Sequence, residues 1–142
     1  MSAQPRLGCG AAIVQGGRLL LVRRLLEPEA GCWGLPGGKV DWLEPVEQAV
    51  RREIEEELAI RLTSLSLLCV VDQIDAQRGE HWLAPVYLAD TFDGEVRNVE
   101  PEKHSDIGWF ALDSLPEPLT VATRRALFAL SERRLQSTTA MN

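Results

Sequence analysis

The sequence predicts an α/β fold in which two helices pack on the faces of a central mixed β-sheet. Apolar runs bounded by turn-forming residues outnumber the two segments with helical periodicity, residues 44–58 and 120–135. The chain has 142 residues, the length of one domain of about 100–200 residues. We therefore expect a single domain over residues 1–142, with frayed ends at residues 1–5 and 136–142.

The predicted strands are apolar runs that end at turn-forming residues. They cover residues 7–14, 19–22, 33–35, 62–74, 82–89 and 109–112. Gly16 and Gly17 lie between the first two runs, and their permissive backbone predicts a β-hairpin there. Residues 27–31 and 98–106 are interrupted by proline, so we expect loops at both places.

The helix predicted over residues 44–58 has one apolar face. At about 100° per residue, a single arc holds Val46, Val50, Ile54 and Leu58. A proline near the start suits the first turn of a helix, where its missing N–H has no helical partner. The second helix, over residues 120–135, is predicted from the same kind of apolar pattern.

Composition limits the partners that this chain can have. The formal net charge is −6, from 21 acidic and 15 basic side chains, which argues against binding to polymeric nucleic acid. No apolar run reaches membrane-spanning length, so no membrane partner is expected. The cysteines Cys9, Cys32 and Cys69 lack the spacing of a metal-binding pair and are odd in number, so we expect buried or free thiols in a reducing cytoplasm.

Three glutamates, Glu53, Glu56 and Glu57, border the apolar face of the first predicted helix. Carboxylates this close repel one another, and a divalent cation bound through oxygen ligands would offset the repulsion. Mg²⁺ suits such a cluster, because it keeps coordination positions for water and phosphate; Mn²⁺ is a possible substitute. The alternative is a solvated acidic helix face balanced by Arg51 and Arg52.

The residues from the preceding glycine turn to the end of this helix form a long pattern. They read Gly38-x5-Glu44-x7-Arg52-Glu53-Ile54-x-Glu56-Glu57-x-Ala59-Ile60. This pattern resembles the Nudix box of MutT-like hydrolases, with one departure, because Ala59 stands where the family has glycine. Similarity to the family extends over residues 7–130.

The resemblance implies an α/β/α sandwich that hydrolyses a nucleoside diphosphate linked to another group. It implies that Glu53, Glu56 and Glu57 bind Mg²⁺ together with a backbone carbonyl of the turn at Gly37. Two further box residues have supporting roles in the family: Arg52 orients the glutamates, and Glu44 supports the loop. The expected proton acceptor is Glu53 or Glu57, with Glu100 in the later loop as an alternative.

The stretch Asn98 to Lys103, followed by Trp109, resembles the branch that cleaves nucleoside triphosphates, including modified ones, to monophosphate and pyrophosphate. ADP-ribose and dinucleotide substrates stay open, as does a nucleotide sensor without turnover. The residues expected to contact this small-molecule substrate are Arg23, Gly38 and Trp42. Whether the chain forms a homodimer is left open.

Overall fold

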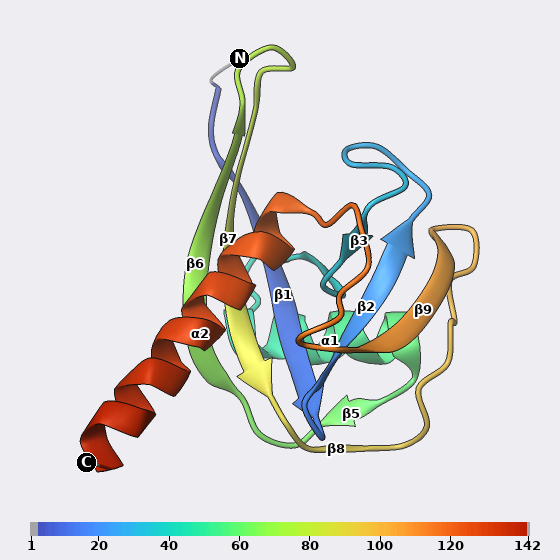
Figure 1. The fold of residues 1–142 in the computed structure, drawn as a ribbon. Helices are drawn as coiled ribbons and strands as arrows, with labels where there is room; N and C mark the ends of the chain where they lie inside the picture. Colours follow the sequence, from blue (N-terminus) through green and yellow to red (C-terminus); the bar gives the residue numbers. More distant parts are fainter. Residues whose placement is uncertain (1–2, 142) are drawn as a thin grey trace.

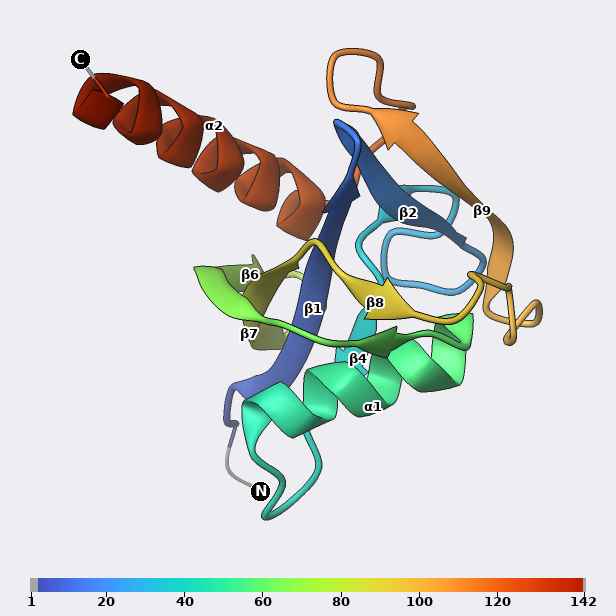
Figure 2. The same ribbon diagram turned by 90° about the horizontal axis from the view of Figure 1, so that it is seen from below.

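The computed structural model describes the backbone of residues 3–141 and the side chains of residues 3–136. A seven-stranded mixed sheet is covered by helix α1 on one face and helix α2 on the other (Figures 1 and 2). The helices are α1 (Val46–Leu58) and α2 (Val121–Met141). The strands are β1 (Arg6–Gln15), β2 (Arg18–Arg24), β3 (Trp33–Gly34), β4 (Gly37–Lys39), β5 (Arg61–Leu62), β6 (Ser66–Asp75), β7 (Glu80–Ala89), β8 (Phe92–Asp93) and β9 (His104–Ala111).

Strand β1 joins the two halves of the sheet. It pairs in parallel with β7, and β7 continues antiparallel to β6. On its other edge, β1 pairs with β2 only at Val14 and Gln15, beside the predicted Gly16-Gly17 turn. Strand β2 then diverges to pair with β3 and β9, and the gap beside the start of β1 is filled by β4. This divergence allows Gly37 and Gly38 of β4, called the glycine turn below, to enter the sheet beside β1.

Two hydrophobic cores lie on opposite faces of the sheet. The first includes Ile13 and Leu20 from the sheet and Val50, Ile54 and Leu58 from α1. All five side chains are fully buried, as the apolar face of the helix predicts. The prediction of a mixed sheet between helices is confirmed.

The second core lies between the sheet and α2. It includes Leu19 and Leu21, whose neighbour Leu20 points to the other core, because successive side chains of a strand alternate between faces. On the helix, Ala126 belongs to this core and Leu127 packs against it.

Several boundaries differ from the sequence-based expectation. Helix α1 begins at Val46, because Pro45 is the extended N-cap residue with φ −60° and ψ 143° rather than part of the first turn. The expected strand over residues 62–74 is divided into β5 and β6, which lie in different sheets. The end of the expected loop over residues 98–106 is the start of β9, where His104 pairs with Arg24.

The chain ends were expected to fray, and this stays a prediction. Residues 1–2 and 142 lie outside the described residues. Helix α2 continues past the expected end at Leu135 to Met141, although the side chains of residues 137–141 are not described.

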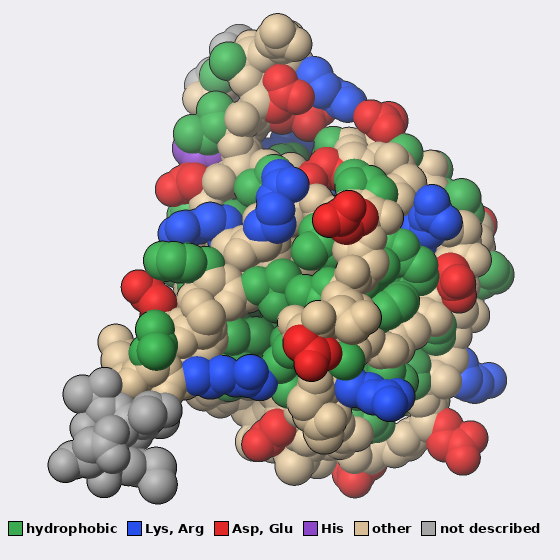
Figure 3. Space-filling view, in the orientation of Figure 1, with side chains coloured by type: hydrophobic (Ala, Val, Ile, Leu, Met, Phe, Trp, Pro, Cys, Tyr) green, Lys and Arg blue, Asp and Glu red, His purple; other side chains and the backbone are tan. Residues whose placement is uncertain are grey.

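The molecular surface mixes both signs of charge. On the face seen in Figure 3, acidic and basic side chains alternate without forming a continuous stripe of one kind. Within the described residues, no helix is long and apolar enough to cross a membrane.

Candidate active site

The site begins at the glycine turn of β4, which is pressed between β1 and α1. Gly37 pairs with Gly10 and Gly38 pairs with Cys9. A Cβ atom on Gly37 would overlap the Cys9 carbonyl, and one on Gly38 would overlap the carboxylate of Glu53. Glycine at position 37 therefore lets β4 lie this close to β1, and glycine at position 38 lets the Glu53 carboxylate lie against the turn.

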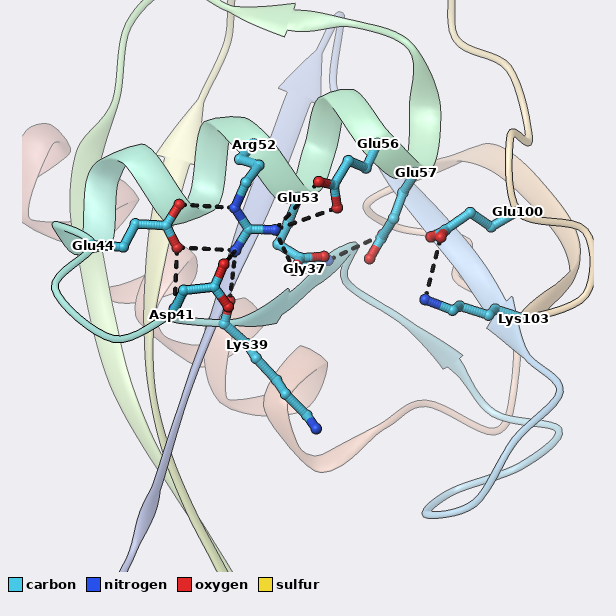
Figure 4. Close-up of polar contacts among 10 residues, drawn as sticks. All are labelled: Gly37, Lys39, Asp41, Glu44, Arg52, Glu53, Glu56, Glu57, Glu100 and Lys103. Carbon is cyan, nitrogen blue, oxygen red and sulfur yellow. Dashed lines mark hydrogen bonds and ion pairs between the residues drawn. The ribbon is translucent and has the colours of Figure 1, made fainter.

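Two glutamates of α1 point at this turn (Figure 4). The Glu57 side chain is buried, and its Oε2 accepts a hydrogen bond of 3.3 Å from the Gly37 N–H. Glu53 is largely buried, with 16 % of its side chain exposed, and lies against Gly38. Glu56, which lies three residues after Glu53 on the same helix, has 54 % of its side chain exposed.

Burial changes the acid–base behaviour of Glu57. Loss of solvent, and after it the negative charge of Glu53, raise the pKa of its carboxyl to about 8, against a smaller lowering by the Gly37 N–H. The nearby Glu100 also raises this pKa, whereas Lys103 lowers it. The structure thus places a carboxyl with an unusually high pKa beside a second carboxylate.

Arg52 links the acidic side chains on the outer side of this cluster. Its guanidinium donates two hydrogen bonds to Glu44, at 2.8 and 2.9 Å, and one of 3.0 Å to Glu53. It also donates to Glu56 and to the backbone carbonyl of Lys39. Glu44 receives a further hydrogen bond from the Asp41 N–H, so it connects the helix to the loop before it. The Arg52 hydrogen bonds and this N–H lower the pKa of Glu44 to about 2.

The loop between β8 and β9 closes the other side of the site. Arg97 N–H and Val99 N–H donate to the carbonyls of Leu58 and Glu57 at the end of α1, at 2.9 and 3.0 Å. This brings Glu100 and Lys103 to the edge of the cluster, where they form an ion pair of 3.2 Å (Figure 4).

A cavity of about 490 Å³ lies on the other side of the glycine turn. It opens between the loop after β2 and the turn from β6 to β7, which lie at the same end of the molecule (Figure 1). Its lining includes Glu27, Glu29, Gln73, Arg78, Trp82 and Val121. A Cβ atom on Gly8 would lie 3.4 Å from the Gly38 carbonyl and 3.5 Å from the Trp82 ring, so one cavity wall adjoins the turn.

Residue Glu29 fixes the shape of this cavity. Its Oε1 accepts a hydrogen bond of 2.8 Å from Gln73, and its Oε2 accepts one of 2.9 Å from the Val121 N–H at the start of α2. Sequence analysis missed this cavity, because its walls come from distant segments and no local pattern marks them.

Comparison with known proteins matches this arrangement to a family. Residues 4–130 match the family described as the NUDIX domain. The chain belongs to the Nudix family. A crystal structure of a MutT NUDIX hydrolase from Burkholderia pseudomallei is 71 % identical, with a TM-score of 0.88 over 89 % of this chain and 98 % of that chain. The predicted family is therefore confirmed.

Two curated relatives of this Nudix chain are named for different activities. An ADP-ribose pyrophosphatase of Methanocaldococcus jannaschii is 34 % identical over 80 % of this chain and 66 % of that protein. An oxidized purine nucleoside triphosphate hydrolase of Danio rerio is 31 % identical over 73 % of this chain and 65 % of that protein. This chain thus spans a little under two thirds of each relative's length.

The departure from the Nudix box at Ala59 leaves the end of the helix intact. Ala59 takes the left-handed conformation, with φ 61° and ψ 28°, and its N–H donates to the Glu55 carbonyl at 3.0 Å. An L-residue with a Cβ atom is strained in this conformation, which glycine adopts freely.

The three residues expected to bind substrate, Arg23, Gly38 and Trp42, lie on β2, on β4 and in the loop after β4. The Arg23 guanidinium donates to the Gly31 carbonyl at 3.1 Å and lies 5.9 Å from the centre of the Trp33 ring. Trp42 is 89 % exposed in the loop between β4 and α1. Gly38, by contrast, lies directly at the carboxylates.

The donor set of the Nudix box fits a hard divalent cation. Two crowded carboxylates, Glu53 and Glu57, face the backbone of the glycine turn; Arg52 pairs with Glu53, whereas Glu57 is buried with little compensating charge. Among the described residues, and with the side chains in their present positions, no three Asp, Glu, His or Cys side chains form a group that could hold a metal ion. Glu56 is held by Arg52 instead.

Proposed function

We propose that this chain hydrolyses the phosphoanhydride of a nucleoside triphosphate, with a modified base as the preferred kind, to a nucleoside monophosphate and pyrophosphate. The observation that carries this proposal is the convergence of Glu53 and Glu57 on the Gly37-Gly38 turn. A solvated acidic helix would leave these carboxylates in water, whereas Glu57 is buried beside a second acid. Without a cation, a retained proton on Glu57 relieves this crowding, whereas a bound cation would stabilise both carboxylates in their charged form.

Glu53, Glu56 and Glu57, with a carbonyl of the glycine turn, would hold Mg²⁺ or Mn²⁺. The bound ion would neutralise phosphate oxygens and lower the pKa of a coordinated water. Arg52 positions the glutamates through the charge-assisted hydrogen bonds described above. Either Glu53 or Glu57 accepts the proton of the attacking water, with Glu100 as the alternative acceptor.

The cavity beside the glycine turn supports a place for the nucleoside. Its volume is that of a small-molecule site, and the Trp82 ring gives it a flat apolar wall. Gly8 lies beside both this ring and the Gly38 carbonyl. Gln73 and Glu29 supply polar groups that a base can contact. In this proposal one substrate extends from the carboxylates past the glycine turn to this cavity.

Two substrate classes stay in competition. The zebrafish relative supports modified triphosphates, whereas the archaeal relative supports ADP-ribose. The segment between Arg61 and Ala84 contains no proline, unlike many ADP-ribose enzymes of the family, and this favours triphosphates. A cytoplasmic location stays a prediction. Whether the chain forms a homodimer stays open.

The decisive experiment is a product analysis with Mg²⁺ and a panel of ordinary and oxidised nucleoside triphosphates, ADP-ribose and dinucleotides. We expect pyrophosphate and a monophosphate from a triphosphate, and loss of turnover in excess EDTA. If AMP and ribose phosphate are the main products, the substrate is ADP-ribose and the assignment of a triphosphate is wrong. Binding of nucleotides without any turnover would favour a sensor.

A matched pair of variants tests the site itself. Glu57→Gln keeps the shape of the side chain and should lower kcat by at least about 100-fold, a typical loss for a group that acts directly in the reaction. Glu55→Gln, on the exposed side of the same helix, should keep normal turnover. Full activity of Glu57→Gln would refute the assignment of the carboxylates.

A further inference from the structure

The site contains a cationic side chain that does not belong to the Nudix box. The chain has two lysines, Lys39 and Lys103; in Figure 4 the Lys103 side chain lies at the edge of the acidic cluster, whereas the Lys39 side chain points away from it. Lys39 lies on β4, with its Nζ 6.0 Å from the centre of the Trp82 ring. Lys103 lies on the opposite side, in the loop that closes the site at the end of α1.

A polyphosphate entering this site meets several carboxylates, and Arg52 cannot offset their charge for it. All three guanidinium nitrogens of Arg52 already donate to Glu44, Glu53, Glu56 or the Lys39 carbonyl. A phosphate could use Arg52 only by breaking these hydrogen bonds. Besides the metal ion of the proposed function, the phosphate chain therefore needs a cationic side chain that Arg52 cannot provide.

Lys103 meets this need. Its side chain is 52 % exposed, and within the described part of the chain its Nζ has one ion-pair partner, Glu100 at 3.2 Å. An ammonium group can donate three hydrogen bonds, so this pair leaves capacity for a ligand. The negative charges of Glu53 and Glu57 act on Lys103 as well, which places its charge within reach of the cluster's field.

The position of Lys103 does not depend on its ammonium group. Its carbonyl accepts a hydrogen bond of 2.9 Å from the Leu25 N–H, and its N–H donates to the Glu100 carbonyl at 2.9 Å. The same loop is fixed to α1 by the N–H groups of Arg97 and Val99. Replacement of the side chain therefore leaves the loop anchored, and the ammonium can move without unfolding it.

We propose that Lys103 binds a phosphate oxygen of the substrate, and that Glu100 holds its ammonium at the edge of the cluster until the phosphate arrives. This inference rests on the proposed function, because it assumes a substrate with a phosphate chain. An ammonium is a compact charge on a flexible stem, so Lys103 can exchange a carboxylate partner for a phosphate partner. The exchange leaves the Glu100 carboxylate without its counter-ion beside Glu57.

The test measures binding of inorganic triphosphate, with Mg²⁺ and at fixed ionic strength, by isothermal titration calorimetry. This probe has phosphates but no base, so the result is independent of nucleotide preference. Lys103→Met should weaken binding about 10- to 100-fold, the loss of one hydrogen bond to a charged group. Lys103→Arg should retain most of the affinity, because it restores a cation at the same place.

The double variant Lys103→Met/Glu100→Gln separates binding from charge balance. If Lys103 contacts phosphate, the double variant stays as weak as, or close to, Lys103→Met. Restored affinity in the double variant would mean that Lys103 only neutralises Glu100, and would overturn the proposal. Unchanged affinity of Lys103→Met, or a wild-type protein that binds no triphosphate, would overturn it too.

Arg61→Met is the matched control, because Arg61 forms a comparable pair with Glu55 at 4.0 Å on exposed side chains. It should bind triphosphate normally, and thermal unfolding should show that all variants are folded. Turnover distinguishes the two proposals. If the wild type hydrolyses no nucleotide, the proposed function fails; if it does and Lys103→Met has an unchanged KM, only this inference fails.

Discussion

Glu57 carries a cost in the metal-free protein. Its pKa of about 8 exceeds the ordinary value of 4.5, mainly because the side chain is buried and secondly because Glu53 is near. Between these two pH values the folded state retains a proton that the unfolded state has released. The folding contribution of Glu57 is therefore least unfavourable below pH 4.5 and becomes more unfavourable as the pH rises towards 8.

Replacement of this carboxyl should remove that pH dependence. We expect Glu57→Gln to be more stable than the wild type at pH 9 in EDTA, and this advantage to shrink at pH 5. The difference between the two proteins should change by at most about 1.4 kcal/mol per pH unit, the value for one proton. Urea unfolding at several pH values measures it, and a pH-independent difference would contradict the burial of a charged Glu57.

Ala59 has a strain that a single substitution can remove. Its left-handed conformation disfavours a residue with a Cβ atom, although glycine has more freedom to lose on folding. We expect Ala59→Gly to raise the free energy of unfolding by about 0.5–1 kcal/mol. Ala76→Gly, at an exposed residue without a positive φ, is the control and should be neutral or slightly destabilising. Equal effects of both substitutions in chemical unfolding would argue against strain at Ala59.

At the scale of elements, the two glycines of β4 have different neighbours, and their substitutions should separate stability from activity. In Gly37→Ala the new methyl meets the backbone of Cys9, which cannot move without opening the β1–β4 pairing. We expect a loss of about 1–3 kcal/mol in stability. In Gly38→Ala the methyl meets the end of the Glu53 side chain, which can rotate away.

Gly38→Ala should therefore remain folded, with a melting temperature close to that of the wild type, and lose activity because Glu53 is displaced. Thermal unfolding and a turnover assay on the same preparations measure the two effects. An active Gly38→Ala protein would show that the position of Glu53 against the turn is unnecessary for the reaction.

Elements whose signals are local could be predicted from the sequence. Helix α1 was predictable because Val50, Ile54 and Leu58 recur on one face, and the hairpin because two glycines lie between apolar runs. The start of β9 was not, because residues 104–106 are polar and become a strand only by pairing with Arg24 and Arg23. Tertiary pairing overrides local preference at this point.

The same distinction applies to the site. The glutamates could be predicted because their spacing along one helix is a local property. The contact between Glu57 and Gly37 could be suspected only from the family pattern, and the Lys103–Glu100 pair lies in a loop whose shape depends on α1. The cavity was missed because its walls meet only in the folded chain.

On the scale of the whole molecule, the sheet separates two environments. The α1 side contains the carboxylates, and the α2 side contains the second core and, at its edge, the start of α2 at Val121, which lines the cavity. The glycine turn, with Gly8 beside it, lies between the carboxylates and the cavity wall at Trp82. A substrate that extends from the carboxylates to the cavity would therefore pass over this turn. The shape of β4 would then affect the binding of both ends of the substrate.

The parallel pairing of β1 with β7 also bears on how the chain is made. During synthesis, residues 6–13 leave the ribosome well before their partners at residues 82–89. One edge of an apolar strand stays open in the meantime, and closing it costs the entropy of a long intervening loop. The β1–β7 pairing can therefore form only once β7 has left the ribosome, and until then β2 and β4 are the available partners of β1.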